Sequence, residues 1–391
     1  MKFRILQEAM MSLPKSLLFG AFAVAALTAS AAAQAPVDVS DWQGVLAKAK
    51  QEGVVVVHGA PGRRYADVLQ GAFQKKYPDI RVELDGARNR TAIPRLLRER
   101  QAGIFNQDVW TSGSSAIRLM KPAGAFQPIQ PFLRKDNMED KHWIGGFAAG
   151  FTDHEKTFFY SFDGTVQHPI HINWDVIKKD QIKTIQDLLK PEFAGKIVWD
   201  DPRVGGSGNG ASLTFLENFG EDFVRRFYSQ KGVFTTNRRQ AAEWVVRGRY
   251  PIAIGLDDSQ LEIFVKEGLG KNVLPLDDSF YKVQQLSPGF GSVGVMDKAP
   301  HPHAAAVYVN WLLSREGQQA WVRVPRNSRR TDVKSPDPTL SPKPTVTYFN
   351  GHNEKYIEVR QRLQELARQV IAAPMPKKRK RRSKGSSSKS E

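Results

Sequence analysis

The sequence predicts an α/β protein made of two successive units, each a largely parallel sheet with helices against it. The main observation is an alternation of strand-like and helix-like segments, once along residues 41–120 and again along residues 184–276. Such alternation is typical of parallel strands, because a helix returns the chain to the start of the next strand. The chain has 391 residues, which is enough for two domains of ordinary size.

The first unit opens with a helix at Asp41–Glu52, where apolar side chains recur at helical spacing. Val54–His58 is rich in β-branched residues, which is typical of a strand buried on both faces. Further helices and strands of this unit are expected at residues 65–76, 80–84, 93–101, 108–111 and 114–120.

The second unit contains a strand at Lys196–Trp199 and a buried strand at Pro251–Leu256. Its helices are expected at residues 184–191, 211–219, 221–229, 240–247 and 258–267, with a further strand at 272–276. Beyond this unit we expect an extended, Gly-rich segment at Phe290–Met296, a helix at His303–Arg323 and a last helix at Asn353–Ile371.

Residues 1–35 have the pattern of a secretory signal peptide. Basic residues precede an apolar run at residues 17–27, and small residues occupy 28–33. Cleavage is expected near Ala33 or Ala35. The apolar run is too short to span a membrane comfortably, and no later segment reaches the roughly 18 apolar residues that a spanning helix needs. We therefore expect an exported chain with no transmembrane segment.

The charge and the cysteine count narrow the functional classes. The formal charge is +17, of which +2 falls in residues 1–35 and +7 in residues 374–391, leaving +8 on the body of the chain. This excess favours negatively charged ligands. The chain has no cysteine, which excludes disulfides, thiolate metal sites and lipid attachment through an N-terminal cysteine. An exported protein without such a tether is expected in the periplasm.

The C-terminal residues 374–391 differ from the rest and are expected to be disordered. They hold the basic run Lys377–Arg382 and a Ser/Lys/Gly tail, with nothing apolar to bury. Such a run can bind nucleic acid. Because the signal peptide directs the chain to export, we expect no nucleic-acid partner. The basic run is expected either to contact anionic lipid or to have no binding role.

Two junctions between a loop and a helix are the main candidates for a binding site. Thr111–Ser115 closes one strand and opens a helix, and Gly205–Gly210 precedes a helix in the second unit. Amides at a helix start, together with serine hydroxyls, favour an anion, and ligands of α/β sheets bind beyond the carboxyl ends of strands. Each junction read alone is better explained as a capped helix start, and it is their occurrence in two successive α/β units that favours a binding site. The candidate residues are Ser112, Gly113, Ser114, Ser207, Gly208 and Asn209.

Three further residues are candidates on charge. Arg330, after the Trp-rich helix, is expected to close over the ligand, because a guanidinium holds carboxylate or phosphate with two hydrogen bonds. Arg63 follows the first strand. Asp257 could bind the amino group of a zwitterion. Solvated loops, and a helix cap for Asp258, are the alternatives.

No motif for catalysis or for a cofactor emerges. No lysine follows Gly205–Gly210 as a phosphate-binding P-loop requires, and Ser207 lacks the glycine that a hydrolase nucleophile needs two residues later. Gly289–Gly294 matches GxGxxG, but Val295 and Met296 continue a strand instead of opening a helix. The eight histidines show no HExxH spacing. We expect no catalytic residue, no cofactor and no metal site.

Several stretches together resemble the ferric-ion-type extracellular solute-binding proteins of ABC importers, over roughly residues 40–335. The stretches that carry the resemblance are Val54–His58, Asp108–Ser114, Gly195–Arg203, Gly206–Gly208 and, as the most specific, Asn310–Gln318. The resemblance implies the type II periplasmic binding fold, with two α/β lobes joined by hinge crossover strands and a ligand cleft between them.

The resemblance also implies how the chain is divided. His168–Asn173 and Phe290–Met296 would be the crossovers. The expected parts are a signal peptide at 1–35, lobe 1 at 36–170, lobe 2 at 171–288, completion of lobe 1 at 289–345, a C-terminal helix at 346–373 and the basic tail at 374–391.

The chain departs from the iron-binding members in one respect. Those members carry adjacent tyrosines after the strand that corresponds to Pro251–Leu256, where this chain has Asp257 and Asp258 and has no Tyr-Tyr pair anywhere. The expected function is therefore binding of a small anionic or zwitterionic solute, an organic phosphate or phosphonate first and a carboxylate second, by a monomer that delivers it to an ABC permease. Ferric iron transport and an exported phosphoester hydrolase are the alternatives.

Overall fold

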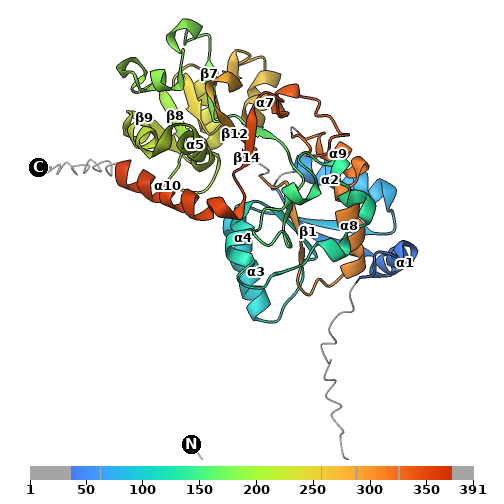
Figure 1. The fold of residues 1–391 in the computed structure, drawn as a ribbon. Helices are drawn as coiled ribbons and strands as arrows, with labels where there is room; N and C mark the ends of the chain where they lie inside the picture. Colours follow the sequence, from blue (N-terminus) through green and yellow to red (C-terminus); the bar gives the residue numbers. More distant parts are fainter. Residues whose placement is uncertain (1–36, 62, 257, 287–288, 325, 372–391) are drawn as a thin grey trace, which may run out of the picture. The chain divides into compact units, whose positions relative to one another are not determined.

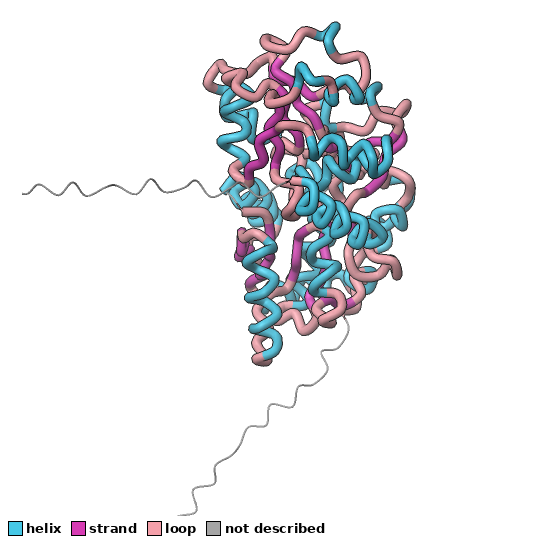
Figure 2. Tube along the Cα trace, turned by 90° about the vertical axis from the view of Figure 1, so that its left-hand side faces the viewer, coloured by secondary structure: helices cyan, strands magenta, loops and turns pink. Residues whose placement is uncertain are grey.

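The computed structural model describes residues 37–61, 63–256, 258–286, 289–324 and 326–371. The expected signal peptide and basic tail lie outside these ranges. Within them the chain forms three sheets with helices against them (Figure 1). Figure 2 shows strands enclosed by helices in both halves of this part of the chain. None of the helices in the described ranges is both long enough and apolar enough to cross a membrane.

The first sheet has six strands in the order β2-β1-β3-β13-β4, with β5 also paired to β13. Strand β1 is parallel to β2 and β3, whereas β13 is antiparallel to its three neighbours. The strands are β1 (Val54–Gly59), β2 (Arg81–Gly86), β3 (Val109–Ser112), β4 (Phe126–Gln127), β5 (Tyr160–Ser161) and β13 (Ser292–Met296). We call this sheet and its helices the first lobe.

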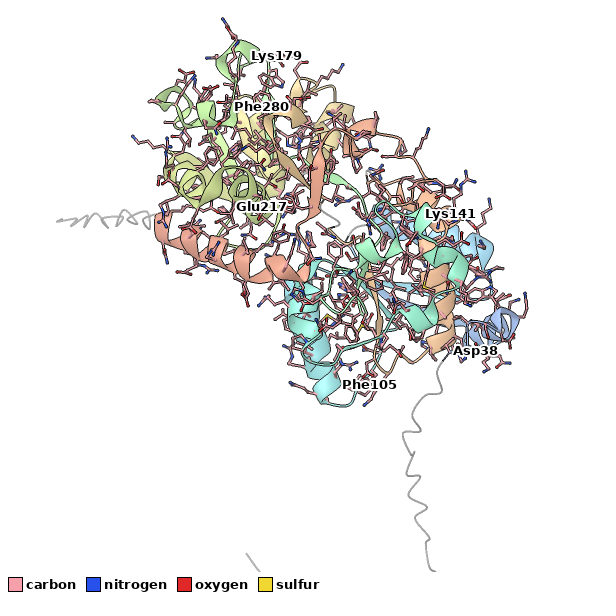
Figure 3. All side chains as sticks on the ribbon, viewed as in Figure 1. Asp38, Phe105, Lys141, Lys179, Glu217 and Phe280 are labelled. Atoms are coloured by element: carbon pink, nitrogen blue, oxygen red, sulfur yellow. The ribbon has the colours of Figure 1, made fainter. Side chains whose placement is uncertain are left out.

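Helices cover both faces of the first sheet, because its strands carry buried side chains on both faces. Val55 and Val57 join the core cluster under α1, α2, α8 and α9, while Trp110 of β3 joins the cluster under α3 and α4. Figure 3 shows side chains filling the space around these elements. The helices are α1 (Trp42–Glu52), α2 (Arg63–Lys76), α3 (Asn89–Gln101), α4 (Ser114–Met120), α8 (Pro302–Leu313) and α9 (Arg315–Trp321).

The second sheet has five strands in the order β11-β7-β10-β8-β9. Strand β8 lies parallel to β9 and β10, and β7 is antiparallel to β10 and β11. The strands are β7 (Ile170–Asn173), β8 (Ile197–Asp200), β9 (Gly232–Thr235), β10 (Ile252–Ile254) and β11 (Val273–Pro275). The helices of this second lobe are α5 (Ser207–Ser229), α6 (Arg238–Val246), α7 (Asp258–Lys266) and α10 (Ile357–Val370).

A third sheet of three strands links the two lobes, in the order β14-β12-β6. Strand β6 (Val166–Gln167) lies in the chain between β5 and β7, and β12 (Val283–Leu286) lies between β11 and β13. Both therefore carry the chain from one lobe to the other. The sequence placed the crossovers at residues 168–173 and 290–296. These segments instead supply β7 and β13, so the crossings lie a few residues earlier. Strand β14 (Thr347–Asn350) runs parallel to β12.

Short 3-10 helices fill the connections. They lie at Gln130–Phe132, Lys135–Met138, Asp140–His142, Phe147–Gly150, Lys179–Gln181, Ile185–Leu189, Pro191–Phe193, Asp278–Phe280, Pro338–Leu340 and Glu354–Tyr356.

Two helices differ from the expectation in an informative way. The helix expected at residues 303–323 is two helices, because Ser314 leaves helical geometry and its hydroxyl caps α9 by accepting a hydrogen bond from the Gly317 amide, at 3.2 Å. Helix α5 begins at Ser207 and so takes in most of the loop expected at residues 205–210. It contains a kink at Gly220, where φ is 80°, and this kink separates the two helices expected at 211–219 and 221–229.

Candidate functional site

The first predicted loop lies where β3 ends and α4 begins. Ser112 is fully buried, and its hydroxyl accepts a hydrogen bond from Asn89 Nδ2 on the start of α3. The same amide nitrogen donates to Ser115 Oγ at 2.7 Å. Gly113 is required by its surroundings, because a β-carbon there would collide with the ring of His352. Ser114 is the first residue of α4.

The second predicted loop lies at the carboxyl end of β8, where α5 begins. The amide of Gly208 donates to the Asp200 carboxylate at 3.0 Å, and that carboxylate also binds Arg238. Gly208 packs tightly against the Asp200 carbonyl and against Gly255, so a side chain has no room there. Part of this helix start is thus already satisfied by an internal anion. The amides of Ser207 and Asn209 remain without intrahelical partners, as at any helix start.

Asn209 does not present its side chain to an open space. It is fully buried, and its Oδ1 accepts from Arg360 Nε at 3.0 Å while its Nδ2 donates to the Arg360 carbonyl at 3.1 Å. Ser207 contributes its carbonyl, which accepts from Gln167 Nε2 on the crossing strand β6 at 3.2 Å. The side chain of Asn209 therefore holds Arg360 in position.

The C-terminal segment brings two groups that the sequence did not indicate, His352 and Arg360. The Arg360 guanidinium donates to the carbonyls of Gly351, at 3.1 Å, and Gly206, at 3.3 Å. His352 lies against Gly113 of the first loop. These two side chains thus connect the loop of the first lobe with that of the second.

A second guanidinium, that of Arg326, lies beside them. A β-carbon at Gly289 would lie 3.3 Å from Arg326 Nη2, and Arg326 Nε donates to the Tyr65 hydroxyl at 3.1 Å. Burial, and then the charges of Arg360 and Arg326, lower the pKa of His352 to about 3. We call Arg326, His352 and Arg360, with the loops at residues 112–113 and 206–209, the junction cluster.

Burial also changes the pKa of Arg360. It lowers the pKa of Arg360 to about 10, so the guanidinium stays charged near neutral pH. His352 is neutral there. The cluster therefore carries positive charge where the helix α5 presents its positive end. Such surroundings attract an anion and repel a cation.

His58, at the end of β1, is a further group that sequence reasoning missed. Its ring is fully buried and stacks on Trp110, with ring centroids 3.6 Å apart. Burial, only partly offset by Asp85, lowers its pKa to about 4. Neither ring nitrogen has a hydrogen-bond partner among the described residues, and Asn89 Oδ1 also lacks one. A β-branched strand gives no sign of such a group.

The remaining predicted residues lie elsewhere or outside the description. Arg330 is buried, binds Asp332 through Nε at 2.8 Å and Nη2 at 2.9 Å, and donates to the Leu313 carbonyl at 3.0 Å. The structure thus does not bring it to the junction cluster, and the Asp332 carboxylate already neutralises its charge. Arg63 is exposed at the start of α2. Asp257 lies outside the described residues.

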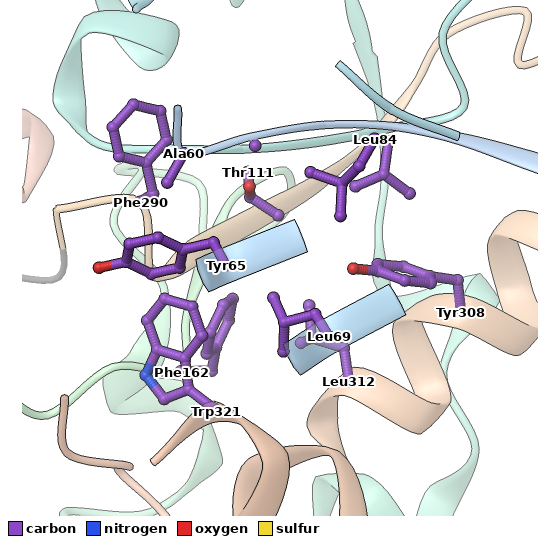
Figure 4. A pocket seen from close by; sticks show the side chains of 12 residues that line it. Ala60, Tyr65, Leu69, Leu84, Thr111, Phe162, Phe290, Tyr308, Leu312 and Trp321 are labelled. Atoms are coloured by element: carbon purple, nitrogen blue, oxygen red, sulfur yellow. The ribbon is translucent and has the colours of Figure 1, made fainter. Parts of the chain in front are cut away.

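Two cavities of the first lobe are poor candidates for the solute. Figure 4 shows a cavity lined mainly by apolar side chains, among them Tyr65, Phe162 and Trp321, with a volume of about 10 Å³. That is room for about one water. A hollow of about 620 Å³ is lined partly by Glu83, Asp85 and Glu99, which disfavour an anion. In the described ranges no group of three or more His, Asp or Glu side chains could hold a metal ion.

Comparisons with known proteins agree with this architecture. The model of the family described as bacterial extracellular solute-binding protein matches residues 54–323. A curated relative, an uncharacterized protein of Haemophilus influenzae, is 27% identical over 290 residues, which is 71% of this chain and 78% of that protein.

Solved structures show the same fold. Iron-bound HitA from Pseudomonas aeruginosa has a TM-score of 0.62 and 16% identity, covering 80% of this chain and 99% of that one. The periplasmic binding protein AfuA from Actinobacillus pleuropneumoniae, with fructose-6-phosphate bound, has a TM-score of 0.61 and 20% identity, covering 82% and 99%. Apo ferric ion-binding protein A from Pasteurella haemolytica has a TM-score of 0.63 and 13% identity, covering 81% and 98%.

The predicted two-lobed periplasmic binding fold is confirmed by these structures. The resemblance that the sequence carried is confirmed by the family match, which covers more than half of the chain. This chain belongs to the family of bacterial extracellular solute-binding proteins.

Proposed function

We propose that this protein is the solute-binding component of an ABC importer and that its solute is a small anion, an organic phosphate or phosphonate first and a carboxylate second. The observation that carries the proposal is the junction cluster, where Arg326, His352 and Arg360 lie between a loop of each lobe. A site of this charge favours an anionic group.

A phosphate group fits these surroundings best. Guanidinium groups and helix-start amides bind its oxygens with charge-assisted hydrogen bonds, and Ser207 adds a hydroxyl. The body of the chain carries an excess charge of +8, which also attracts anions. The similar protein AfuA was solved with fructose-6-phosphate, so the fold accommodates a sugar phosphate.

Ferric iron is the second candidate, because HitA, with the same fold, was solved with iron bound. Iron carriage requires anionic ligands gathered around the metal. The junction cluster offers cations instead, and the described residues gather no set of three His, Asp or Glu side chains elsewhere. For these two reasons we propose an anion before iron.

The test is isothermal titration calorimetry of the purified protein with fructose-6-phosphate, 2-aminoethylphosphonate, citrate, fructose and ferric citrate. We expect binding of a phosphorylated or phosphonate solute and none of fructose. Iron binding without affinity for any of the organic anions would overturn the proposal. Steady release of inorganic phosphate from fructose-6-phosphate would show an exported phosphoester hydrolase instead.

We further propose that the chain works in the periplasm as a monomer and delivers its solute to a permease. The support is the signal pattern of residues 1–35 and the family to which the chain belongs. Fractionation of cells that express the full chain should place a shortened protein in the periplasmic extract. Retention of the full-length chain in the cytoplasm would contradict this.

A further inference from the structure

The C-terminal segment, residues 346–371, lies beyond the family match at residues 54–323 and yet contacts both lobes. On the side of the first lobe, Lys121 Nζ binds Glu354 at 2.7 Å and the Glu354 amide donates to the Thr152 carbonyl at 2.7 Å. On the side of the second lobe, Leu363 and Leu366 of α10 join the core that contains α5. The segment is therefore held at both ends by packing that is independent of any solute.

Arg360 lies between these two anchors and differs from Arg203 and Arg238, the arginines near the start of α5. Arg203 pairs with Asp201 and Arg238 with Asp200. Arg360 instead donates to an amide oxygen and two backbone carbonyls, all neutral. In the described part of the chain no carboxylate lies within ion-pair distance of its guanidinium. A half-buried charge satisfied only by neutral acceptors has lost much of its hydration without gaining a counter-ion.

The groups around Arg360 add to its uncompensated positive charge. The Gly206 carbonyl that accepts from Arg360 immediately precedes α5, whose first stretch runs from Ser207 to the kink at Gly220 and has its positive end there. The neutral ring of His352 lies within range of the charges of both Arg360 and Arg326, so the second guanidinium is also near this site. Two guanidinium groups and a helix start therefore converge with no internal anion that neutralises Arg360. A bound anion would remove the imbalance.

We propose that Arg360 binds the anionic group of the solute directly, so that the C-terminal segment supplies one wall of the binding site. This inference rests on the proposed function and goes further, because it assigns a ligand-binding residue outside the region that the family match covers. The chemistry indicated is a tetrahedral oxyanion, a phosphate ester or phosphonate, whose several oxygens reach Arg360 and the α5 amides together. Asn209 then has the role of a positioning residue that aligns the guanidinium.

The test compares four forms of the full chain by calorimetry with fructose-6-phosphate and 2-aminoethylphosphonate as probes. They are the wild type, Arg360→Gln, Arg360→Lys and Arg362→Gln. Arg362 is the matched control, since it lies on the same helix, is 63% exposed and faces Glu221 at 3.8 Å. We expect Arg360→Gln to lose affinity about 10- to 100-fold, the loss of a charge-assisted hydrogen bond. Arg360→Lys should recover part of the affinity, and Arg362→Gln should stay within about twofold of the wild type.

A further variant separates binding from a purely structural role. Asn209→Asp keeps the acceptor for Arg360 Nε but places a carboxylate beside the guanidinium, where it competes with the solute. We expect affinity to fall while the urea midpoint is unchanged or higher. If Arg360 only supports the start of α5, the binding free energy of this variant will fall by no more than its free energy of unfolding. That result would overturn the inference.

The proposed function and the role of Arg360 fail in different ways. If the wild type binds neither probe, the proposed function is at fault. If the wild type binds and Arg360→Gln binds within about twofold of it, the solute is anionic but Arg360 does not contact it. Should Arg360→Gln fail to fold, Asn209→Asp and Arg360→Lys still decide the question, because both retain hydrogen-bonding groups at the helix start.

Discussion

At the scale of the residue, His58 shows how a sheet can hold a group that it does not need for packing. The ring is fully buried against Trp110, and its nitrogens have no hydrogen-bond partner among the described residues. An apolar side chain would fill the same space without this cost.

Burial makes His58 a source of acid sensitivity. Its pKa is about 4 in the folded state, below the ordinary value of 6.5, so the unfolded chain binds the proton more tightly. Stability is therefore fully present above pH 6.5 and falls as the pH drops toward 4. Between pH 7 and pH 5 this group accounts for a loss of about 2 kcal/mol. His58→Gln should remove about that much of the decrease, measured as free energy of unfolding from urea titrations at both pH values.

The control for this experiment is His154→Gln, because His154 is exposed. That variant should keep the acid sensitivity of the wild type. His352, whose pKa is also lowered, stays in both variants and leaves a remaining pH dependence. An unchanged decrease in His58→Gln would show that the ring is hydrated or paired in solution.

The candidate residues show which part of a site a sequence reveals. Glycines and serines at 112–113 and 206–208 were predictable, because only small residues fit where loops approach closely. Which arginine lies beside these loops was not predictable from the sequence. Arg330 has a carboxylate two residues away at Asp332, and it takes that partner. Which guanidinium lacks an internal counter-ion depends on contacts across the chain, such as that between Arg360 and Gly206.

At the scale of the element, the stretch Asn310–Gln318 joins two helices to the loops beneath them. Asn310 Oδ1 accepts from the Arg134 amide at 2.8 Å, and its Nδ2 donates to the Phe132 carbonyl at 2.6 Å. Gln318 Nε2 donates to the Leu312 carbonyl at 2.7 Å. The side chains of Asn310 and Gln318 are therefore turned inward and maintain the fold of the first lobe.

Asn310→Ala should consequently destabilise the protein without changing its solute. Removal of the amide leaves buried backbone groups at Phe132 and Arg134 without partners, which costs about 2–4 kcal/mol. The free energy of unfolding from urea titration measures this cost. Exposed Asn106→Ala should change it by less than about 0.5 kcal/mol. A large loss of calorimetric affinity in folded Asn310→Ala would mean that the stretch reaches the solute.

Elements with strong periodicity were predictable, and short polar ones were not. Most expected helices and the buried strands at β1, β8 and β10 were found within a few residues of their predicted positions. Strands β12 and β14 were missed, because Val283–Leu286 and Thr347–Asn350 are four residues each and mix polar with apolar side chains. Their strand geometry comes from pairing with each other and with β6, which local sequence does not encode.

At the scale of the whole molecule, the lobes are connected by the crossing strands, and polar side chains of α2 and α7 form a further contact between them. Arg64 of α2 and Glu262 of α7 form an ion pair at 2.7 Å, with exposed fractions of 48% and 31%. The sequence predicted two lobes from the alternation of elements, but not this contact, since charged residues on helix surfaces give no sign of their partners. In a protein that closes around its solute, a contact between lobes favours the closed state.

The ion pair between the lobes should therefore contribute to solute affinity, although weakly. An exposed pair stabilises by about 0.2–1 kcal/mol, so Arg64→Gln and Glu262→Gln should each lower affinity for fructose-6-phosphate by up to about fivefold. The double variant should lose no more than either single one, since both remove the same interaction. The effect should shrink in about 1 M salt, where exposed charges are screened.

An ion pair within one lobe serves as the control for the Arg64 and Glu262 variants. Arg247 and Glu243 of the second lobe lie 3.0 Å apart with exposed fractions of 64% and 46%. Because both belong to the same lobe, their distance does not depend on closure, and their removal should leave affinity unchanged. Equal losses for the two pairs would indicate a general effect of charge on the anion. Losses confined to Arg64 and Glu262, and non-additive there, would show that closing the lobes forms this contact and that the solute gains affinity from it.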